Sequence, residues 1–237
     1  MDGEALLERL SAEPQQAAIF LDVDGVLAPI VPRPEDAAVP DDTREEVLRL
    51  HGKYALVACV SGRTGADAKR IVGLDDLVYV GEHGLELEPS APQWREALRS
   101  FADSVDWPVE DKGLTLSFHY RGADDEGAAE AFLLQVAERA REAGLRPRFG
   151  RKVLEIRPPV DASKGTAVRA LLGERGLRRA LYAGDDTTDL DAFHVVGELE
   201  LGVRVGVASA ESPRGITEQA DVVVHSPAEF LGVLRTL

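Results

Sequence analysis

The sequence predicts an α/β protein whose doubly wound parallel sheet carries a second, smaller α+β domain as an insertion. Apolar runs of strand length alternate with helical segments near both ends of the chain, which is the pattern of a parallel sheet covered by helices. Between about residues 89 and 158 the strands alternate apolar and polar residues, as in a sheet with one open face. We therefore predict a core domain of residues 1–88 and 159–237 and an inserted domain of residues 89–158.

The charge composition excludes some partners. The chain has 27 Lys and Arg residues against 42 Asp and Glu, which gives a formal net charge of -15. A surface this negative repels phosphate backbones and anionic lipids, so we expect neither nucleic acid nor a membrane as a partner. No apolar stretch approaches the ~20 residues that span a bilayer, and the acidic start does not resemble a signal peptide. We therefore expect a soluble, cytoplasmic protein.

The first part of the core begins with a short helix over residues 4–10 and an apolar strand over residues 17–21. A strand without polar residues is typical of one that is buried on both faces. Prolines between residues 29 and 40 predict a loop without regular structure. The single cysteine, Cys59, lies in an apolar run, where we expect a core residue. The next elements are predicted as helix 41–51, strand 54–60, helix 65–72 and strand 77–80.

The inserted domain and the rest of the core follow in order. In the insertion we predict helix 94–105, strand 114–120, helix 126–143 and strand 152–156, bounded by prolines at 89–92 and 158–159. In the second part of the core we predict helix 163–172, strand 180–183, helix 187–195, strands 201–207 and 222–224, and helix 227–234. The change of rhythm at both proline-rich boundaries is what separates the two predicted domains.

Two acids, Asp22 and Asp24, end the first strand and precede Gly25. The carboxyl ends of parallel strands are where α/β proteins bind ligands. Acids this close repel unless a cation or a proton compensates them, and a divalent ion would do so. Asp22 would then be a nucleophile held at a metal, and Asp24 a proton donor and acceptor. A polar strand end remains the alternative. An EF-hand calcium loop is a poorer match, because this sequence lacks the acid that such a loop needs at its fifth position and the glutamate at its twelfth.

The second strand ends in Ser61-Gly62-Arg63, and a lysine, Lys164, stands in the predicted first turn of a later helix. A hydroxyl, a glycine N–H and a fixed positive charge are the donors that a phosphoryl group prefers. A cation at a helix N-terminus opposes the helix dipole, unless an anion shares the site. The alternatives are an N-cap, formed by Ser61 or Thr64, and a solvated surface lysine.

Three carboxylates follow the strand at residues 180–183, namely Asp185, Asp186 and Asp189. One or two of them have an ordinary explanation, because Asp186 can cap the next helix and Asp189 can favour its N-terminus. All three together indicate a hard cation with oxygen ligands, such as Mg2+. An ion held by so few carboxylates would keep water and substrate oxygens as its other ligands.

In this order, the four motifs resemble those of the haloacid-dehalogenase-like phosphatases: Asp22-Val23-Asp24-Gly25, Ser61-Gly62-Arg63, Lys164, and the acids at 185–189. Residues 81–86, 109–113, 119–121 and 154–158 narrow the resemblance to the trehalose-6-phosphate phosphatase family. The resemblance covers nearly the whole chain from residue 19 onward. One departure is Val26, where the family more often has threonine.

The resemblance implies a Rossmann-like core with an α/β cap inserted between the second and third motifs. By this analogy Asp22 attacks phosphorus and forms an aspartyl-phosphate, while Asp24 protonates the leaving oxygen and later deprotonates the attacking water. Mg2+ would be held by Asp22, the backbone carbonyl of Asp24 and Asp185, with Asp189 bound directly or through water.

The resemblance also implies the substrate contacts. Ser61, Gly62 and Lys164 would hold the phosphoryl oxygens. The sugar would be bound by Arg63, Glu110, Lys112 and Glu155, the last three of which would close over it from the cap. The alternative for these cap residues is a solvated strand face. His83 and His119 receive no chemical role.

The expected function is that of a Mg2+-dependent phosphatase that hydrolyses trehalose 6-phosphate. Two alternatives stay open: a phosphatase of another phosphorylated sugar, such as a sucrose or mannosyl phosphate, and a catalytically inactive sugar-phosphate-binding regulatory domain. The expected partner is a small sugar phosphate. The sequence does not determine the oligomeric state, and a monomer is the simplest expectation.

Overall fold

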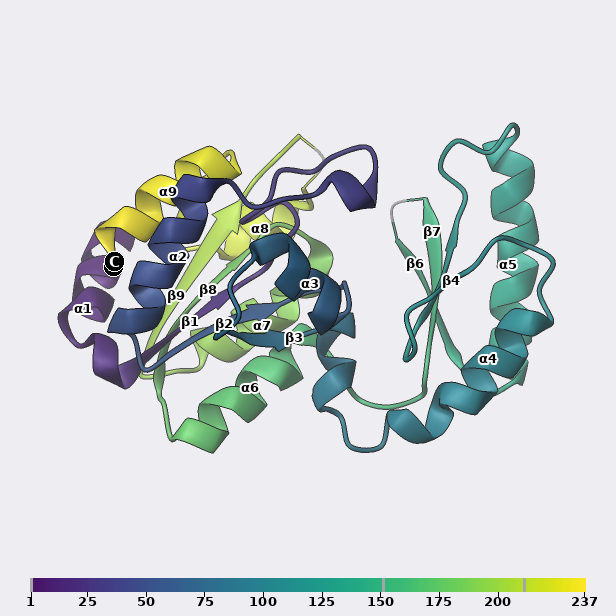
Figure 1. Cartoon of the computed structure of the whole chain (residues 1–237), viewed down its shortest axis with the longest axis horizontal. Coiled ribbons are helices and arrows are strands. Elements are labelled where there is room, and N and C mark those ends of the chain that lie inside the picture. The colour runs from purple at the N-terminus through teal and green to yellow at the C-terminus, as the bar shows by residue number, and fades with distance from the viewer. Residues whose placement is uncertain (1, 151, 211) are drawn as a thin grey trace. The chain divides into compact units, whose positions relative to one another are not determined.

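The computed structural model describes residues 2–150, 152–210 and 212–237, and it divides into two compact units. Unit 1 is formed by Met1–Gly84 together with Ala162–Leu237, and unit 2 by Leu85–Asp161. Figure 1 shows a sheet between helices in unit 1 and a separate sheet beside two helices in unit 2. The predicted fold class, a doubly wound α/β core with a smaller α+β part, is confirmed.

The described residues of unit 1 contain a six-stranded parallel sheet with the strand order β10-β9-β8-β1-β2-β3. Its strands are β1 (Ala17–Leu21), β2 (Leu56–Val60), β3 (Val78–Val80), β8 (Arg179–Gly184), β9 (Leu201–Val207) and β10 (Val222–Val224). Every residue of β1 is buried, because β1 lies between β2 and β8 and helices cover both faces of the sheet. This central position explains why its sequence is entirely apolar.

Helices cover both faces of this sheet (Figure 1). Side chains that alternate along β1 enter different cores: Ile19 and Leu21 pack into one cluster and Phe20 into the other. The first cluster includes residues of α1 (Gly3–Ala12), α2 (Asp41–Lys53), α3 (Gly65–Val72) and α9 (Pro227–Thr236). The second includes residues of α6 (Lys164–Arg175), α7 (Leu190–Gly197) and α8 (Arg214–Gln219). The sheet is thus doubly wound.

Unit 2 has, within its described residues, a four-stranded antiparallel sheet with the order β4-β5-β7-β6. The strands are β4 (Glu110–Asp111), β5 (Leu116–His119), β6 (Arg146–Gly150) and β7 (Val153–Arg157). Leu116, Phe118, Leu154 and Ile156 pack against α4 (Arg95–Asp103) and α5 (Glu126–Glu142). Alternate residues such as Ser117 and Glu155 therefore lie on the opposite face of the sheet.

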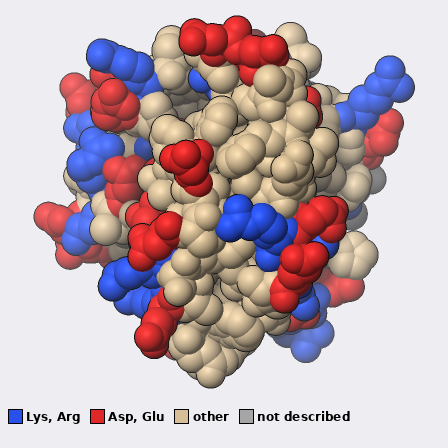
Figure 2. Space-filling model, turned by 90° about the vertical axis from the view of Figure 1, so that its right-hand side faces the viewer, with Lys and Arg blue, Asp and Glu red and all other residues tan. Residues whose placement is uncertain are grey.

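Figure 2 views the side on which α4 and α5 lie in Figure 1, and it shows acidic and basic side chains interspersed around a broad area without charge. The excess of negative charge is not gathered into one patch on this face. Among the described residues, each helix is too short or too polar to cross a membrane.

Some local predictions were wrong. The loop at residues 29–40, expected to lack regular structure, contains the 3-10 turn Pro34–Asp36, which begins with proline because the first position of such a turn needs no backbone donor. Other 3-10 turns are Pro14–Gln16, Pro92–Trp94 and Thr187–Asp189, and the last two precede α4 and α7 where continuous helices were expected. The segment Glu82–Leu87 also contains 3-10 structure, but it is broken by a kink with non-helical backbone angles at His83 and Gly84. The strands β4 and β6 and the helix α8 were not predicted.

Candidate active site

The first acids of the site follow two neighbouring strands. Asp22 continues β1, and its backbone N–H donates to the Ala183 carbonyl of β8 at 3.0 Å. Asp185 directly follows β8, so the pairing of these strands brings both side chains to the same edge of the sheet. Gly25 adopts a left-handed φ of 80°, and a Cβ there would collide with the Asp185 carboxylate. This close approach explains the glycine after the Asp22-Val23-Asp24 sequence.

Asp22, Asp185 and Asp189 each offer a carboxylate oxygen, and these oxygens lie within 4.8 Å of one another. All three residues are buried, with 5%, 7% and 0% of their surface exposed. Burial raises the pKa of Asp22 well above its ordinary value, and the nearby Asp189 and Asp185 charges raise it further, although Lys164 lowers it. A cluster of buried carboxylates fits a hard divalent cation such as Mg2+, because the ion would offset their mutual repulsion.

Lys164 is the first residue of α6 and is 2% exposed, which excludes the alternative of a solvated surface lysine. Its Nζ lies 2.8 Å from Asp22 Oδ2 and 2.7 Å from Asp189 Oδ1. Ser163 caps α6 in a capping box with Thr166. This cap fixes where the helix begins and so places Lys164 in its first turn. Burial alone would lower the pKa of Lys164, but the carboxylates of Asp189 and Asp22 outweigh it and raise this pKa.

Asp189 anchors the site through hydrogen bonds. Its Oδ1 accepts from Lys164 Nζ and from the Tyr182 hydroxyl, each at 2.7 Å. Its Oδ2 accepts from the backbone N–H groups of Asp185 and Asp186, each at 3.0 Å. A carboxylate accepts about four hydrogen bonds, so these contacts occupy most of its capacity. Tyr182 was not predicted as a site residue. Its signal in the sequence was a tyrosine inside a buried strand, where the hydroxyl needs a partner.

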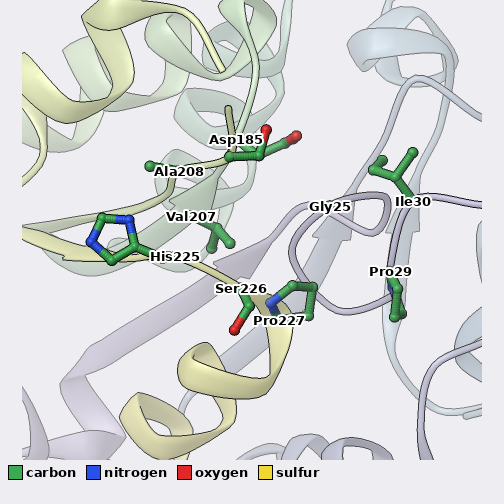
Figure 3. A pocket seen from close by; sticks show the side chains of 10 residues that line it. Gly25, Pro29, Ile30, Asp185, Val207, Ala208, His225, Ser226 and Pro227 are labelled. Carbon is green, nitrogen blue, oxygen red and sulfur yellow. The ribbon is translucent and has the colours of Figure 1, made fainter. Parts of the chain in front are cut away.

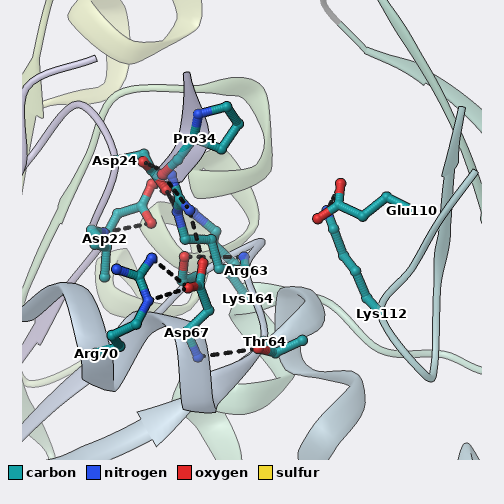
Figure 4. Close-up of polar contacts among 12 residues, drawn as sticks. Asp22, Asp24, Pro34, Arg63, Thr64, Asp67, Arg70, Glu110, Lys112 and Lys164 are labelled. Carbon is teal, nitrogen blue, oxygen red and sulfur yellow. Dashed lines mark hydrogen bonds and ion pairs between the residues drawn. The ribbon is translucent and has the colours of Figure 1, made fainter. Parts of the chain in front are cut away.

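Arg63 lies against Asp24 rather than standing free (Figure 4). Its Nε donates to Asp24 Oδ2 at 2.6 Å and its Nη2 to Oδ1 at 2.8 Å, so the guanidinium engages both carboxylate oxygens. Its Nη1 also donates to Asp67 at 2.8 Å and to the Pro34 carbonyl at 3.2 Å. The hydrogen bond to Asp24 is the main reason that the pKa of Arg63 is raised. Arg63 was predicted to bind the sugar, and its contacts with Asp24, Asp67 and Pro34 were not predicted.

The Ser61-Gly62-Arg63 segment forms a turn directly after β2. Ser61 is 1% exposed, and its Oγ accepts from the backbone N–H of Arg63 at 3.2 Å. The N-cap of α3 is Thr64, whose Oγ1 accepts from the Asp67 N–H. The alternative in which Ser61 caps this helix is therefore excluded, and its hydroxyl lies inside the turn.

The candidate sugar-binding residues of unit 2 lie on the strands of its sheet or beside them. Glu110 of β4 is paired with Ser117 of β5, which is paired in turn with Glu155 of β7, so all three share the face opposite α4 and α5. Glu110 contacts His119 Nε2 at 2.9 Å and Lys112 Nζ at 3.8 Å. Figure 4 shows the Glu110 and Lys112 side chains directed toward each other.

A cavity of about 190 Å³ lies next to Asp185 in unit 1 (Figure 3). Its walls are mainly apolar and come from the loop after β1, the end of β9 and the start of α9; they include Pro29, Ile30, Val207, Ala208 and Pro227. Of the sequence-predicted site residues, Asp185 alone lines it.

The trehalose-phosphatase family model matches residues 20–108 and 106–222. A probable trehalose-phosphate phosphatase of Oryza sativa subsp. japonica is 32% identical over 266 residues, which cover 96% of this chain and 70% of that protein. The trehalose-phosphate phosphatase of Mycobacterium marinum is 34% identical over 247 residues, which cover 92% of this chain and 61% of that protein. An uncharacterised glycosyl hydrolase of Mycobacterium tuberculosis is 36% identical over 219 residues; the match covers 81% of this chain but only 16% of that much longer protein.

Solved structures share the fold. The C-terminal domain of a trehalose-6-phosphate phosphatase from C. albicans superimposes with a TM-score of 0.74 at 24% identity, covering 98% of this chain and 95% of that one. The C-terminal domain of a trehalose synthase regulatory protein from Candida albicans superimposes with a TM-score of 0.68 at 13% identity, covering 98% and 97%. An enzyme and a regulatory protein thus have this architecture in common, so function depends on the residues of the site.

Proposed function

This chain belongs to the trehalose-phosphatase family, and we propose that it hydrolyses trehalose 6-phosphate to trehalose and phosphate. The observation that carries this proposal is the buried arrangement of Asp22, Asp185 and Lys164 at the carboxyl edge of the sheet. It offers a nucleophile, a set of metal ligands and a positive charge within one site, as the removal of a phosphoryl group requires.

In the proposed reaction Asp22 attacks phosphorus and forms an aspartyl-phosphate while the bond from phosphorus to the sugar oxygen breaks. Asp24 gives a proton to this leaving oxygen and then takes one from the water that hydrolyses the aspartyl-phosphate. Both oxygens of Asp24 accept hydrogen bonds from Arg63. These bonds occupy about half of the hydrogen-bonding capacity of the Asp24 carboxylate, so lone pairs remain for the proton that it exchanges with the substrate.

We further propose Mg2+ as the cofactor, held by Asp22, Asp185 and the main-chain carbonyl of Asp24. A bound Mg2+ would supply positive charge to the phosphoryl oxygens. Asp189 would act through the hydrogen bonds that it already accepts, because these hold Lys164 and the backbone around Asp185 in place. Lys164, together with Ser61 and Gly62, would bind the phosphoryl oxygens.

Glu110, Lys112 and Glu155 are the proposed readers of the sugar. Carboxylates accept hydrogen bonds from sugar hydroxyls and an ammonium group donates to them. The shared face of Glu110 and Glu155 on the sheet of unit 2 supports this role, because a row of polar side chains can contact several hydroxyls of one disaccharide.

The test is phosphate release in Mg2+ from a panel that holds trehalose 6-phosphate, sucrose 6-phosphate, a mannosyl phosphate, glucose 6-phosphate and a small aryl phosphate. We expect turnover of trehalose 6-phosphate well above that of the others. Asp22→Asn is the matched control and should abolish turnover while the circular-dichroism spectrum stays unchanged. A different preferred sugar would overturn the substrate, and no turnover of any ester would favour a regulatory domain.

A further inference from the structure

The segment that ends the first part of unit 1 has an unusual backbone. Three successive residues, Glu82, His83 and Gly84, adopt left-handed φ angles of 49°, 55° and 96°. Residues other than glycine rarely take this conformation, because Cβ crowds the backbone. Such strain persists only where the surrounding structure enforces it, and it is concentrated at functional sites. The cause of this strain should therefore be visible in the contacts of the segment.

Two backbone hydrogen bonds connect these residues to the turn after β2. The Glu82 N–H donates to the Arg63 carbonyl at 2.7 Å, and the His83 N–H donates to the Ser61 carbonyl at 2.9 Å. Successive N–H groups of an extended strand point in opposite directions, so two of them reach one turn only after the backbone has left the strand conformation. The left-handed residues thus allow the chain to hold Ser61 and Arg63 together.

The imidazole of His83 packs against the middle of the same turn. A Cβ on Gly62 would lie 2.6 Å from the Cε1 of His83 and 2.7 Å from its Nε2. Gly62 does not itself have a left-handed φ, so glycine is required here for space rather than for conformation. The far edge of the imidazole ring therefore supports the backbone of Gly62.

Gly84 contacts the other phosphate-binding segment. A Cβ on Gly84 would collide with the carbonyl oxygen of Ser163, the N-cap of α6. Lys164 is the next residue and begins that helix. The left-handed segment therefore touches both segments of unit 1 to which phosphoryl binding is assigned.

We propose that His83 is a positioning residue for phosphate binding: its ring supports Gly62, and its backbone holds Ser61, so that the turn meets the phosphoryl oxygens in a fixed geometry. The proposal rests on the proposed function only in that a phosphoryl group binds at this turn. It is independent of which sugar carries that group.

The test compares two amide side chains of different length. His83→Asn keeps a residue that tolerates the left-handed conformation but is too short to reach Gly62, whereas His83→Gln reaches about as far as the imidazole. We expect His83→Asn to weaken inorganic phosphate binding about tenfold, because small misplacements of positioning groups have effects of this order. His83→Gln should stay within about threefold of wild type on the same grounds.

The measurements are the Kd of inorganic phosphate by titration calorimetry in Mg2+, and KM and kcat for a small aryl phosphate. The KM should follow the phosphate Kd, while kcat changes less. If His83 acted only through its backbone conformation, the order would be reversed, with Asn equal to or better than Gln. His194→Ala on α7, where the histidine side chain is 78% exposed, is the control and should change none of these values.

A double-mutant cycle with Gly62→Ala separates the ring contact from other effects. Gly62→Ala alone should weaken phosphate binding because the new methyl group meets the imidazole. The same change in a His83→Asn background should cost at least fivefold less, since the far ring atoms are gone. Additive losses would overturn the ring contact, and a His83→Asn protein that binds phosphate like wild type would overturn the proposal.

The outcomes also separate this inference from the proposed function. A wild-type protein that binds inorganic phosphate but does not hydrolyse trehalose 6-phosphate would contradict the proposed substrate and leave the His83 comparison intact. A wild-type protein that does not bind inorganic phosphate would contradict the inference itself. If His83→Asn does not fold, His83→Gly takes its place in the cycle, because glycine tolerates the left-handed φ and has no side chain that a methyl group at residue 62 could meet.

Discussion

At the scale of single residues, the buried ammonium of Lys164 determines what its neighbours must do. A charge with 2% exposure has to be paired, and its partners are Asp22 and Asp189. Removing one partner of a buried ion pair typically costs about 3–5 kcal/mol, because the other charge stays buried without compensation. Asp189 therefore supports the site through contacts that the protein already makes.

Tyr182→Phe tests this support without removing a charge. The change deletes the hydroxyl that donates to Asp189 Oδ1, so we expect the free energy of unfolding to fall by about 1.5–3 kcal/mol, as for other hydrogen bonds to charged groups. Because Lys164 shares that oxygen, kcat/KM for the phosphorylated sugar should fall as well. Urea denaturation and steady-state kinetics measure the two effects.

Tyr79→Phe is the matched control, since the Tyr79 hydroxyl donates to the Leu74 carbonyl and to none of the site residues discussed above. It should cost stability without changing kcat/KM. Equal kinetic losses in both variants, or an unchanged kcat/KM in Tyr182→Phe, would mean that Tyr182 has only a structural role.

The candidate site could be predicted where chain topology alone brings residues together. Asp22, Ser61 and Asp185 follow neighbouring parallel strands, and such strand ends meet at one edge of a sheet. The pairing of Arg63 with Asp24 could not be predicted, because a guanidinium at a strand end can face solvent, a phosphate or a carboxylate 39 residues away. Side-chain direction in three dimensions decides among these.

At the scale of helices and strands, burial decides what the sequence can reveal. The central strands of unit 1 were predicted because both of their faces are buried, which leaves continuous apolar runs. The strand β6 was missed because it pairs with β7 alone, as an edge strand, and its sequence Arg-Pro-Arg-Phe-Gly needs no apolar alternation. The helix α8 is six residues long and buries only Ile216, too little for a helical pattern.

An ion pair beside β9 predicts a pH-dependent contribution to stability. Arg204 donates to Asp221 from its backbone N–H, Nε and Nη2 at 2.8, 2.9 and 2.7 Å. Burial raises the pKa of Asp221, but the hydrogen bonds from Arg204 outweigh it and lower this pKa. A carboxyl group whose pKa is lowered by folding stabilises the protein above its unfolded pKa, and this contribution is lost as pH falls through the folded pKa.

Asp221→Asn should therefore lower the free energy of unfolding by about 1–3 kcal/mol at pH 7. The gap to wild type should shrink on acidification below about pH 4, where an unperturbed aspartate takes up its proton. Urea denaturation at pH 7 and pH 3 measures both values. The control is Asp75→Asn, because Asp75 is 90% exposed and should matter little at either pH. A gap that is the same at both pH values would contradict the assignment.

If the polar face of the unit 2 sheet binds the sugar, a change on this face should impair turnover of the sugar phosphate and spare esters without a sugar. Glu110→Ala should lower kcat/KM for trehalose 6-phosphate by about tenfold or more, which corresponds to one hydrogen bond to a charged group. Use of a small aryl phosphate should change little, because that ester has no sugar hydroxyls. Glu142→Ala, at the exposed end of α5, is the control. Equal losses on both esters would mean that Glu110 does not read the sugar.

At the scale of the whole molecule, the two units have separate cores. The buried clusters of unit 1 lie on the two faces of its parallel sheet, while the cluster of unit 2 lies between its antiparallel sheet and α4 and α5. No residue is shared between the unit 2 cluster and the other two, as far as the described residues go. Separate cores make separate unfolding transitions the expectation.

The positions of the tryptophans allow these transitions to be distinguished. Both of them, Trp94 and Trp107, lie in unit 2, so tryptophan fluorescence reports the unfolding of that unit alone, whereas far-ultraviolet circular dichroism reports both. Mg2+ with inorganic phosphate should bind unit 1 and stabilise it by about 2.7 kcal/mol at 100 times the dissociation constant. The part of the circular-dichroism transition that comes from unit 1 should then move to higher temperature, while the midpoint of the fluorescence transition should not change.

Phe118→Ala should have the opposite effect. Phe118 is fully buried in the core of unit 2, and truncation of such a residue costs about 3–5 kcal/mol. The fluorescence midpoint should fall, while the transition that responds to Mg2+ and phosphate should remain where it is in the wild-type protein. If both probes moved together in both experiments, the units would unfold as one cooperative body, and the separation of cores would not be a separation of stabilities.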